Sequence, residues 1–152
     1  MKKIVIFLVF VYVLTAFAVD IDAATKLEIK ILEKLVLDIT GKKNPLVYFI
    51  GLSKKKVNLL TRYSVLKKAK TEASADFVFI KDINKKFYAT KPTVALDYSS
   101  FKKCENCIGL FTWRNGRPIL LLIEENLIKF HISLPEDYKY FIESKNFNIG
   151  KK

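Results

Sequence analysis

The sequence is poor in the residues from which most metal sites and catalytic sites are built. It holds one histidine, His131, and two cysteines, Cys104 and Cys107. A structural zinc site takes four ligands, so these residues leave it one ligand short unless two copies of the chain share it. A Ser-His-Asp triad would have to use His131, and no nucleophile-elbow motif lies near it. We therefore expect no metal, no cofactor and no catalytic residues.

Glycine and arginine are also scarce. The five glycines are scattered, so the chain has no glycine-rich phosphate loop. Its only arginines are Arg62, Arg114 and Arg117, whereas lysine supplies the rest of the 27 basic residues. Lysine lacks the planar fork with which arginine binds phosphate. A net charge of +12 carried mostly by lysine favours a solvated surface or an acidic partner, and we expect no nucleic-acid partner.

The first 18 residues have the layout of a secretory signal peptide. Two lysines precede an apolar run over 4–14, and an Ala-Phe-Ala sequence then ends at Ala18. The run is shorter than the roughly 20 residues of a spanning helix, although an uncleaved anchor is an alternative. We predict cleavage after Ala18, or else after Ala24. The remainder, 19–152, is then a single domain in the periplasm or outside the cell, without stable membrane insertion.

Cys104 and Cys107 form a Cys-Glu-Asn-Cys motif that we expect to be disulfide-bonded in an oxidising compartment. Thiol–disulfide exchange needs its first cysteine at a helix N-terminus, where the helix dipole stabilises the thiolate. Cys107 instead leads directly into the apolar segment 108–113. The motif therefore favours a structural disulfide that tightens a loop, with redox catalysis or redox sensing as alternatives.

Hydrophobic periodicity predicts alternating helices and strands in the first two thirds of the chain. Apolar residues at helical spacing predict a helix over 24–40 that ends at Gly41, and a second helix begins near Lys54. Short apolar runs predict strands at 46–50, 65–70, 75–80 and 92–97, with a loop or short helix at 82–88 and a polar loop at 98–106. This order predicts an α/β fold of two or three layers, with a sheet that is parallel in its first half.

The C-terminal part has the clearest local signal, because Asn115-Gly116 lies between the apolar runs 108–113 and 118–123. An Asn-Gly pair in that position is typical of a tight β-hairpin. Alternating apolar residues predict a third strand at 127–132, which completes an antiparallel meander. A capping box from Ser133 to Glu136 predicts a last helix, and 144–152 is expected to be a flexible tail.

The turn after the first predicted strand is a candidate ligand site. Gly51, Ser53, Lys54 and Lys55 lie where a strand ends and a helix begins, which is where open α/β sheets bind ligands. Three lysines in a first helical turn oppose the helix dipole, and such conflicts occur at functional sites. The turn is therefore a candidate site for a small anion. The interpretation that we favour is that Ser53 only caps the helix and that the lysines are solvated.

The hairpin turn is a candidate contact surface. Two of the three arginines, Arg114 and Arg117, flank it, and the only tryptophan, Trp113, precedes it. Tryptophan and arginine are enriched in interface hot spots, so the three residues are predicted to bind a protein partner. The alternative is that Trp113 packs into the core and the arginines flank a solvated turn.

Taken together, residues 46–140 resemble the YfiR-like family of small periplasmic proteins. The similar pieces are the segments 46–51, 75–80, 108–109 and 127–134. The resemblance implies a compact α/β fold and a non-catalytic regulatory role. Such proteins restrain a membrane-bound signalling enzyme, typically a diguanylate cyclase, by binding its periplasmic part, and they can respond to redox state through disulfides.

The chain departs from that family in two places. The apolar strand at 119–123 is additional, and the spacing of Cys104 and Cys107 does not align with the family's cysteines. We expect a secreted, non-catalytic protein that binds a protein partner, in keeping with the resemblance. The alternatives are a periplasmic module that binds a small anion and a thiol–disulfide protein. The sequence leaves open the partner's identity and whether the protein forms a homo-oligomer.

Overall fold

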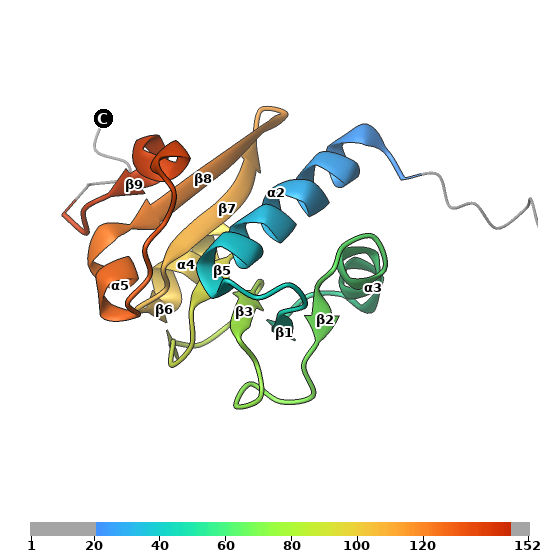
Figure 1. The fold of residues 1–152 in the computed structure, drawn as a ribbon, viewed down its shortest axis with the longest axis horizontal. Helices are drawn as coiled ribbons and strands as arrows, with labels where there is room; N and C mark the ends of the chain where they lie inside the picture. Colours follow the sequence, from blue (N-terminus) through green and yellow to red (C-terminus); the bar gives the residue numbers. More distant parts are fainter. Residues whose placement is uncertain (1–20, 147–152) are drawn as a thin grey trace, which may run out of the picture.

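In the computed structural model, one mixed sheet of seven strands organises residues 21–146, which are the residues that the structure describes (Figure 1). The helices are α2 (Ala23–Thr40), α3 (Lys54–Arg62), α4 (Tyr98–Lys103), α5 (Glu124–Lys129) and the 3-10 helix η1 (Glu136–Phe141). The strands are β1 (Leu46–Ile50), β2 (Lys67–Lys68), β3 (Phe77–Ile80), β4 (Phe87–Tyr88), β5 (Thr93–Ala95), β6 (Cys104–Glu105), β7 (Gly109–Arg114), β8 (Arg117–Ile123) and β9 (Ile142–Glu143).

The strand order in the main sheet is β2-β1-β3-β5-β7-β8-β9, and β4 pairs with β6 in a separate small sheet. Every pair in the main sheet is parallel except the β7–β8 hairpin. The chain passes from β1 to one neighbour, β2, and then crosses back to the other neighbour, β3. This reversal of direction at β1 is the topological switch point of an open α/β sheet.

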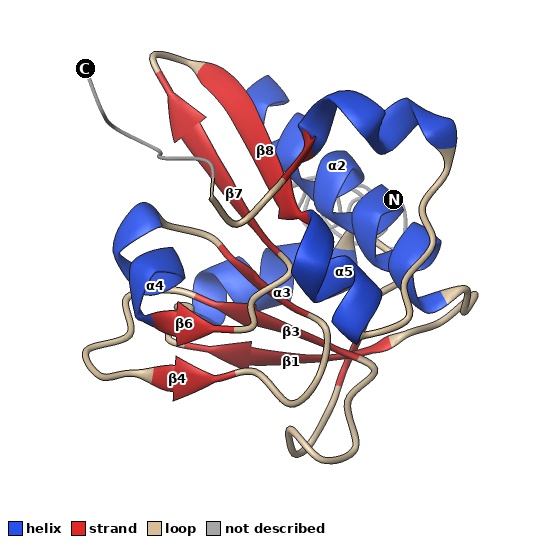
Figure 2. Ribbon diagram, turned by 90° about the vertical axis from the view of Figure 1, so that its left-hand side faces the viewer, coloured by secondary structure: helices blue, strands red, loops and turns tan. Residues whose placement is uncertain are grey.

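The sheet is covered on both faces, which gives three layers (Figure 2). Residues of α2, α3, α5 and η1 pack on one face, where Phe77, Phe79 and Phe111 form the centre of the larger core. Phe101 of α4 and Phe87 of β4 pack on the other face against a smaller apolar cluster. The predicted α/β class with a mixed sheet is therefore confirmed, and the protein has three layers.

The predictions with the strongest local signals hold in detail. The helix predicted over 24–40 is α2, which Asp22 caps by accepting the N–H of Thr25. It ends where Gly41 adopts φ 63° and donates its N–H to the carbonyl of Leu37. The hairpin turn has positive φ at Asn115 and Gly116, as an Asn-Gly turn requires.

Three predictions in the second half of the chain are wrong. The segment predicted as a strand at 127–132 instead belongs to α5 and the turn after it, so there is no three-stranded meander. The polar loop predicted at 98–106 contains the short helix α4, which Asp97 caps. The last helix is a 3-10 helix that follows Pro135, and Ser133 does not cap it.

Two predictions concern residues outside the described part of the chain. The predicted signal peptide, 1–18, lies there entirely, as does the predicted tail at 144–152 apart from 144–146. Within 21–146 no helix combines the length and the apolar character needed to cross a bilayer.

Candidate functional site

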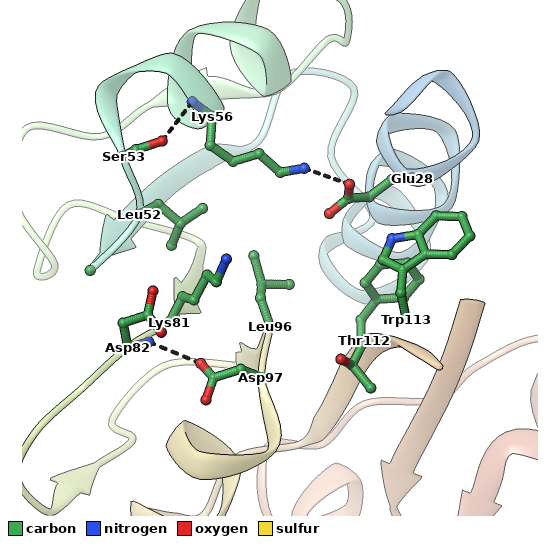
Figure 3. Close-up of a pocket in the computed structure, with 12 residues that line it drawn as sticks. Glu28, Leu52, Ser53, Lys56, Lys81, Asp82, Leu96, Asp97, Thr112 and Trp113 are labelled. Atoms are coloured by element: carbon green, nitrogen blue, oxygen red, sulfur yellow. Dashed lines mark hydrogen bonds and ion pairs between the residues drawn. The ribbon is translucent and has the colours of Figure 1, made fainter. Parts of the chain in front are cut away.

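A cleft of about 640 Å³ lies at the edge of the sheet where β1, β3 and β5 end (Figure 3). After β1 the chain enters α3 on one face of the sheet, whereas after β3 it runs to the small sheet on the other face. Loops that diverge in this way open a crevice at the carboxyl ends of the strands. The volume lies within the range of about 300–1,000 Å³ that is typical of small-molecule sites.

The turn predicted to bind a ligand contributes only half of its predicted residues to this cleft. Gly51 and Ser53 line it, but Lys54 and Lys55 are exposed and do not. The Ser53 hydroxyl oxygen accepts the N–H of Lys56 at 3.2 Å, which makes Ser53 the N-cap of α3. The lysine that reaches the cleft is the third of the run, Lys56, because successive residues of a helix point about 100° apart.

The charge of Lys56 is balanced inside the cleft. Its Nζ atom lies 2.5 Å from Oε2 of Glu28, which comes from α2. The Glu28 side chain is only 13% exposed, so this ion pair is well shielded from water. The pair joins α3 to α2 along the upper rim of the cleft in Figure 3 and leaves Lys56 little charge to offer a ligand.

Lys81, directly after β3, provides a cation with no such partner. It takes part in none of the four ion pairs found among residues 21–146. Figure 3 shows its side chain rising between Leu52 and Leu96 into the cleft. The ammonium group of Lys81 is therefore free to contact a bound molecule.

Two carboxylates, Asp82 and Asp97, lie on the same side of the cleft as Lys81 (Figure 3). Asp97 accepts hydrogen bonds from the Ser100 N–H at 2.8 Å, the Ser100 hydroxyl at 2.6 Å and the Asp82 N–H at 2.9 Å. Burial raises the pKa of Asp97, but these hydrogen bonds and the charge of Lys81 outweigh it and hold the pKa below the usual value. Asp97 is therefore an ionised, fixed carboxylate at neutral pH and is not a proton donor.

Trp113 of β7 forms the opposite wall of the cleft. Its indole packs edge-to-face on Phe111, with the ring centroids 6.2 Å apart, and it remains partly exposed. β5 pairs with β7 only as far as Leu110, so the rest of β7 extends past the end of β5 and brings Trp113 to the cleft. The ligand turn and the tryptophan, which the sequence places in two separate sites, therefore share one cleft.

The two hairpin arginines lie away from this cleft. Arg114 and Arg117 are exposed and directly opposite each other at the tip of the hairpin. Arg114 instead lines a second, more apolar groove of about 580 Å³ on the hairpin, together with Tyr98 and Tyr140. The predicted contact surface is therefore divided: Trp113 lines both hollows, Arg114 lines only the second, and Arg117 lines neither.

Gly51 serves the architecture of the cleft rather than the binding of a ligand. It adopts φ 78°, and a Cβ atom at this position would lie 1.7 Å from the carbonyl oxygen of Lys81. Next to it, the Lys81 N–H donates to the carbonyl of Ile50 at 2.9 Å. The loops after β1 and β3 can therefore meet only because residue 51 has no side chain.

Cys104 and Cys107 are disulfide-bonded, as predicted. Cys104 is the C-cap of α4, so it lies at the end of a helix dipole that disfavours a thiolate, and Cys107 is buried. The buried amide of Asn126 donates to the carbonyl of Cys107 at 2.7 Å and fixes the loop further. This geometry favours a structural disulfide, and the bond is compatible with an oxidising compartment.

His131 lies outside the cleft and is exposed, with a φ of 55°, two residues after the end of α5. Within residues 21–146 no three His, Cys, Asp or Glu side chains come together in a way that would hold a metal ion.

Three lining residues that the sequence analysis did not identify, Lys81, Asp82 and Asp97, have a recognisable signal. Lys81 and Asp82 follow directly after β3, and Asp97 follows within two residues of β5. In a parallel sheet the carboxyl ends of neighbouring strands meet at one edge, so polar residues that follow successive strands are site candidates. Glu28 has no such signal, because only the packing of α2 brings it to the cleft.

Comparison with known proteins finds no matching family model, no matching curated protein and no matching solved structure. The resemblance to the YfiR-like family therefore stays a prediction. The functional interpretation depends on the geometry of the cleft and of the hairpin.

Proposed function

We propose that this protein is a non-catalytic binding protein whose cleft at the ends of β1, β3 and β5 takes a small polar ligand. The observation that carries the proposal is the unpaired ammonium group of Lys81, which faces the indole of Trp113 across a cleft at the topological switch point. An apolar wall with a few convergent polar groups is the usual composition of a small-molecule site.

The state of the polar groups supports binding over catalysis. The only histidine does not line the cleft, the oxygen of Ser53 accepts the capping hydrogen bond, and Asp97 is ionised. General acid–base catalysis needs a group whose pKa lies near the working pH. The pKa of Asp97 is instead lowered, away from neutral pH. The groups that line the cleft are therefore suited to hold a ligand in place.

A thermal-shift screen tests this function. The purified domain is heated with a panel of L-amino acids, dicarboxylates, inorganic phosphate and nucleoside monophosphates, because a ligand that binds only the folded state raises the melting temperature. The matched variants are Lys81→Gln, which removes the free ammonium in the cleft, and Lys54→Gln, which removes one on the same protein outside it.

The expected result is that at least one compound raises the melting temperature of the wild type and of Lys54→Gln, but not that of Lys81→Gln. A response that persists in Lys81→Gln would contradict the assignment of the site. A panel that raises the melting temperature of none of the three proteins would contradict the proposed function.

A second candidate function is the regulation of a protein partner through the tip of the hairpin. The observation in its favour is that β7 and β8 extend past β5 and carry Arg114 and Arg117, both exposed, at their tip (Figure 1). In this proposal the protein lies in the periplasm and restrains a membrane-bound signalling enzyme such as a diguanylate cyclase, through an acidic surface on that enzyme.

A pull-down from solubilised membranes tests the second candidate. Arg114→Glu/Arg117→Glu reverses both charges at the tip, and Lys54→Glu/Lys55→Glu makes the same change in charge on α3 as a control. Capture of a membrane signalling enzyme by the wild type and the control, but not by the arginine variant, is the expected outcome. Equal capture by all three proteins would remove the hairpin from the interface.

A further inference from the structure

We propose that the ligand of the cleft is a zwitterion with an apolar body, the chemistry of a free α-amino acid, whose carboxylate contacts Lys81 and whose ammonium contacts the carboxylates of Asp82 and Asp97. This inference rests on the proposed function and adds the class of ligand. It replaces the small anion that was the candidate ligand of this region from the sequence.

The charge of the lining does not suit a simple anion. Lys56 and Glu28 neutralise each other, which leaves one ammonium, Lys81, beside the two carboxylates of Asp82 and Asp97. The protein as a whole carries a charge of +12, so this cleft is locally acidic on a strongly basic molecule. A small anion would be attracted by Lys81 but repelled by the two carboxylates beside it.

The opposite charges are near one another but are not paired. No carboxylate among residues 21–146 lies within the 4.0 Å ion-pair distance of the Lys81 ammonium. Asp97 is held in place by three hydrogen bonds, and one of them also fixes the backbone of Asp82. The cleft thus presents a cationic group and a fixed anionic group that a ligand of complementary polarity can bridge.

The rest of the lining suits an apolar body. Leu52 and Leu96 flank Lys81 on one side of the cleft, and the indole of Trp113 forms the other side (Figure 3). Because Phe111 packs against the indole edge-to-face, Trp113 has a defined orientation before any ligand binds. The two charged ends of a zwitterion would therefore lie against the Lys81 side, and its side chain would lie between the leucines and the indole.

Isothermal titration calorimetry with three compounds that share a phenyl body tests the class of ligand. L-phenylalanine carries both charges, 3-phenylpropionate lacks the ammonium, and phenethylamine lacks the carboxylate. Each missing contact is a charge-assisted hydrogen bond, so we expect L-phenylalanine to bind about tenfold or more tighter than either analogue.

Two substitutions test which residue contacts each charged end of the ligand. Lys81→Gln should abolish the preference for L-phenylalanine over phenethylamine, and Asp82→Asn, which leaves the carboxylate of Asp97 in place, should reduce the preference over 3-phenylpropionate. Asn tolerates the positive φ of 51° at position 82, and Asp82→Asn leaves the cap at Asp97 intact, so both variants should fold. Lys54→Gln is the control and should keep both preferences.

The outcomes separate this inference from the function on which it rests. If 3-phenylpropionate binds as tightly as L-phenylalanine, or if only a nucleotide or phosphate of the screening panel binds, the zwitterion is wrong and the binding function stands. If neither the phenyl series nor the panel binds the wild type, both proposals are wrong. Loss of L-phenylalanine binding in Lys54→Gln would also overturn the inference, because that residue lies outside the cleft.

Discussion

Replacement of Gly51 by alanine should destabilise the protein far more than the same replacement at Gly41, although both glycines have positive φ. Gly41 has φ 63° and nothing within 4 Å of the position that a Cβ would take. Gly51 has φ 78° and the Lys81 carbonyl oxygen 1.7 Å from that position. The comparison therefore separates the cost of a left-handed backbone from the cost of a steric clash.

The magnitude follows from three contributions. A left-handed residue with a Cβ costs about 1–2 kcal/mol, and Gly41→Ala should cost only this amount. In Gly51→Ala the loops after β1 and β3 must also separate, which breaks the Lys81 N–H to Ile50 hydrogen bond at a cost of about 1 kcal/mol and disturbs packing at the ends of both strands. We expect about 3 kcal/mol or more in total, or a fall of about 10 °C in melting temperature.

Urea unfolding of the wild type and the two variants, followed by circular dichroism, measures these differences in the free energy of unfolding. Gly116→Ala is a further control, because it has φ 73° and also has nothing within 4 Å. If Gly51→Ala loses no more stability than Gly41→Ala and Gly116→Ala, the close approach of the two loops, and with it the described shape of the cleft, is wrong.

Three further predictions concern the disulfide, the cap of α4 and a buried tyrosine. Cys104→Ala/Cys107→Ala should lower the free energy of unfolding by about 2 kcal/mol, because the closed loop is short, and a loss of twice that size would contradict the loop-entropy argument. Neither the wild type nor this variant should reduce insulin. The pKa of Asp97 is lowered in the folded state, so its stabilising effect is present above the unfolded pKa and is lost as the pH falls below about 4. Asp97→Asn should therefore lose stability less steeply than the wild type as the pH falls below about 4, and parallel curves would refute this. Tyr138→Phe removes a 2.7 Å hydrogen bond from the hydroxyl to Asp38 and should cost about 1 kcal/mol in chemical denaturation, whereas an unchanged midpoint would show that water replaces the bond without loss.

The elements that the sequence predicts well have their cause within a few neighbouring residues. Gly41 ends α2, Ser53 starts α3, and Asn115-Gly116 forms the hairpin turn, each through backbone angles or a cap that adjacent residues determine. For these segments, local propensity and the tertiary fold agree.

The errors arise in short segments in which local patterns conflict. The alternation of Ile128, Phe130 and Ile132 resembles a strand, but Glu124 and Glu125 favour a helix start at the positive end of the dipole. In the folded protein that helix buries Leu127 and leaves Ile128 66% exposed. A segment of six residues is too short for hydrophobic periodicity to decide between the two structures.

The candidate site could be predicted only in part, because it combines distant segments. The position of Ser53 at the cleft follows from the rule that ligands bind where strands end and helices begin. The choice of Lys56 over its two neighbours depends on the rotation of α3 against α2. The approach of Trp113 to Lys81 depends on the order and register of β3, β5 and β7, which no local pattern encodes.

The most direct test of the central claim is a titration of the ¹⁵N-labelled protein with L-phenylalanine, followed by two-dimensional NMR. If the cleft at the ends of β1, β3 and β5 is the binding site, the chemical-shift changes will be concentrated at the amides of Lys81, Asp82, Asp97 and Thr112 and at the indole N–H of Trp113. Changes concentrated at Arg114 and Arg117 would contradict the cleft as the binding site, and a spectrum that does not change up to millimolar ligand would contradict the zwitterion as its ligand.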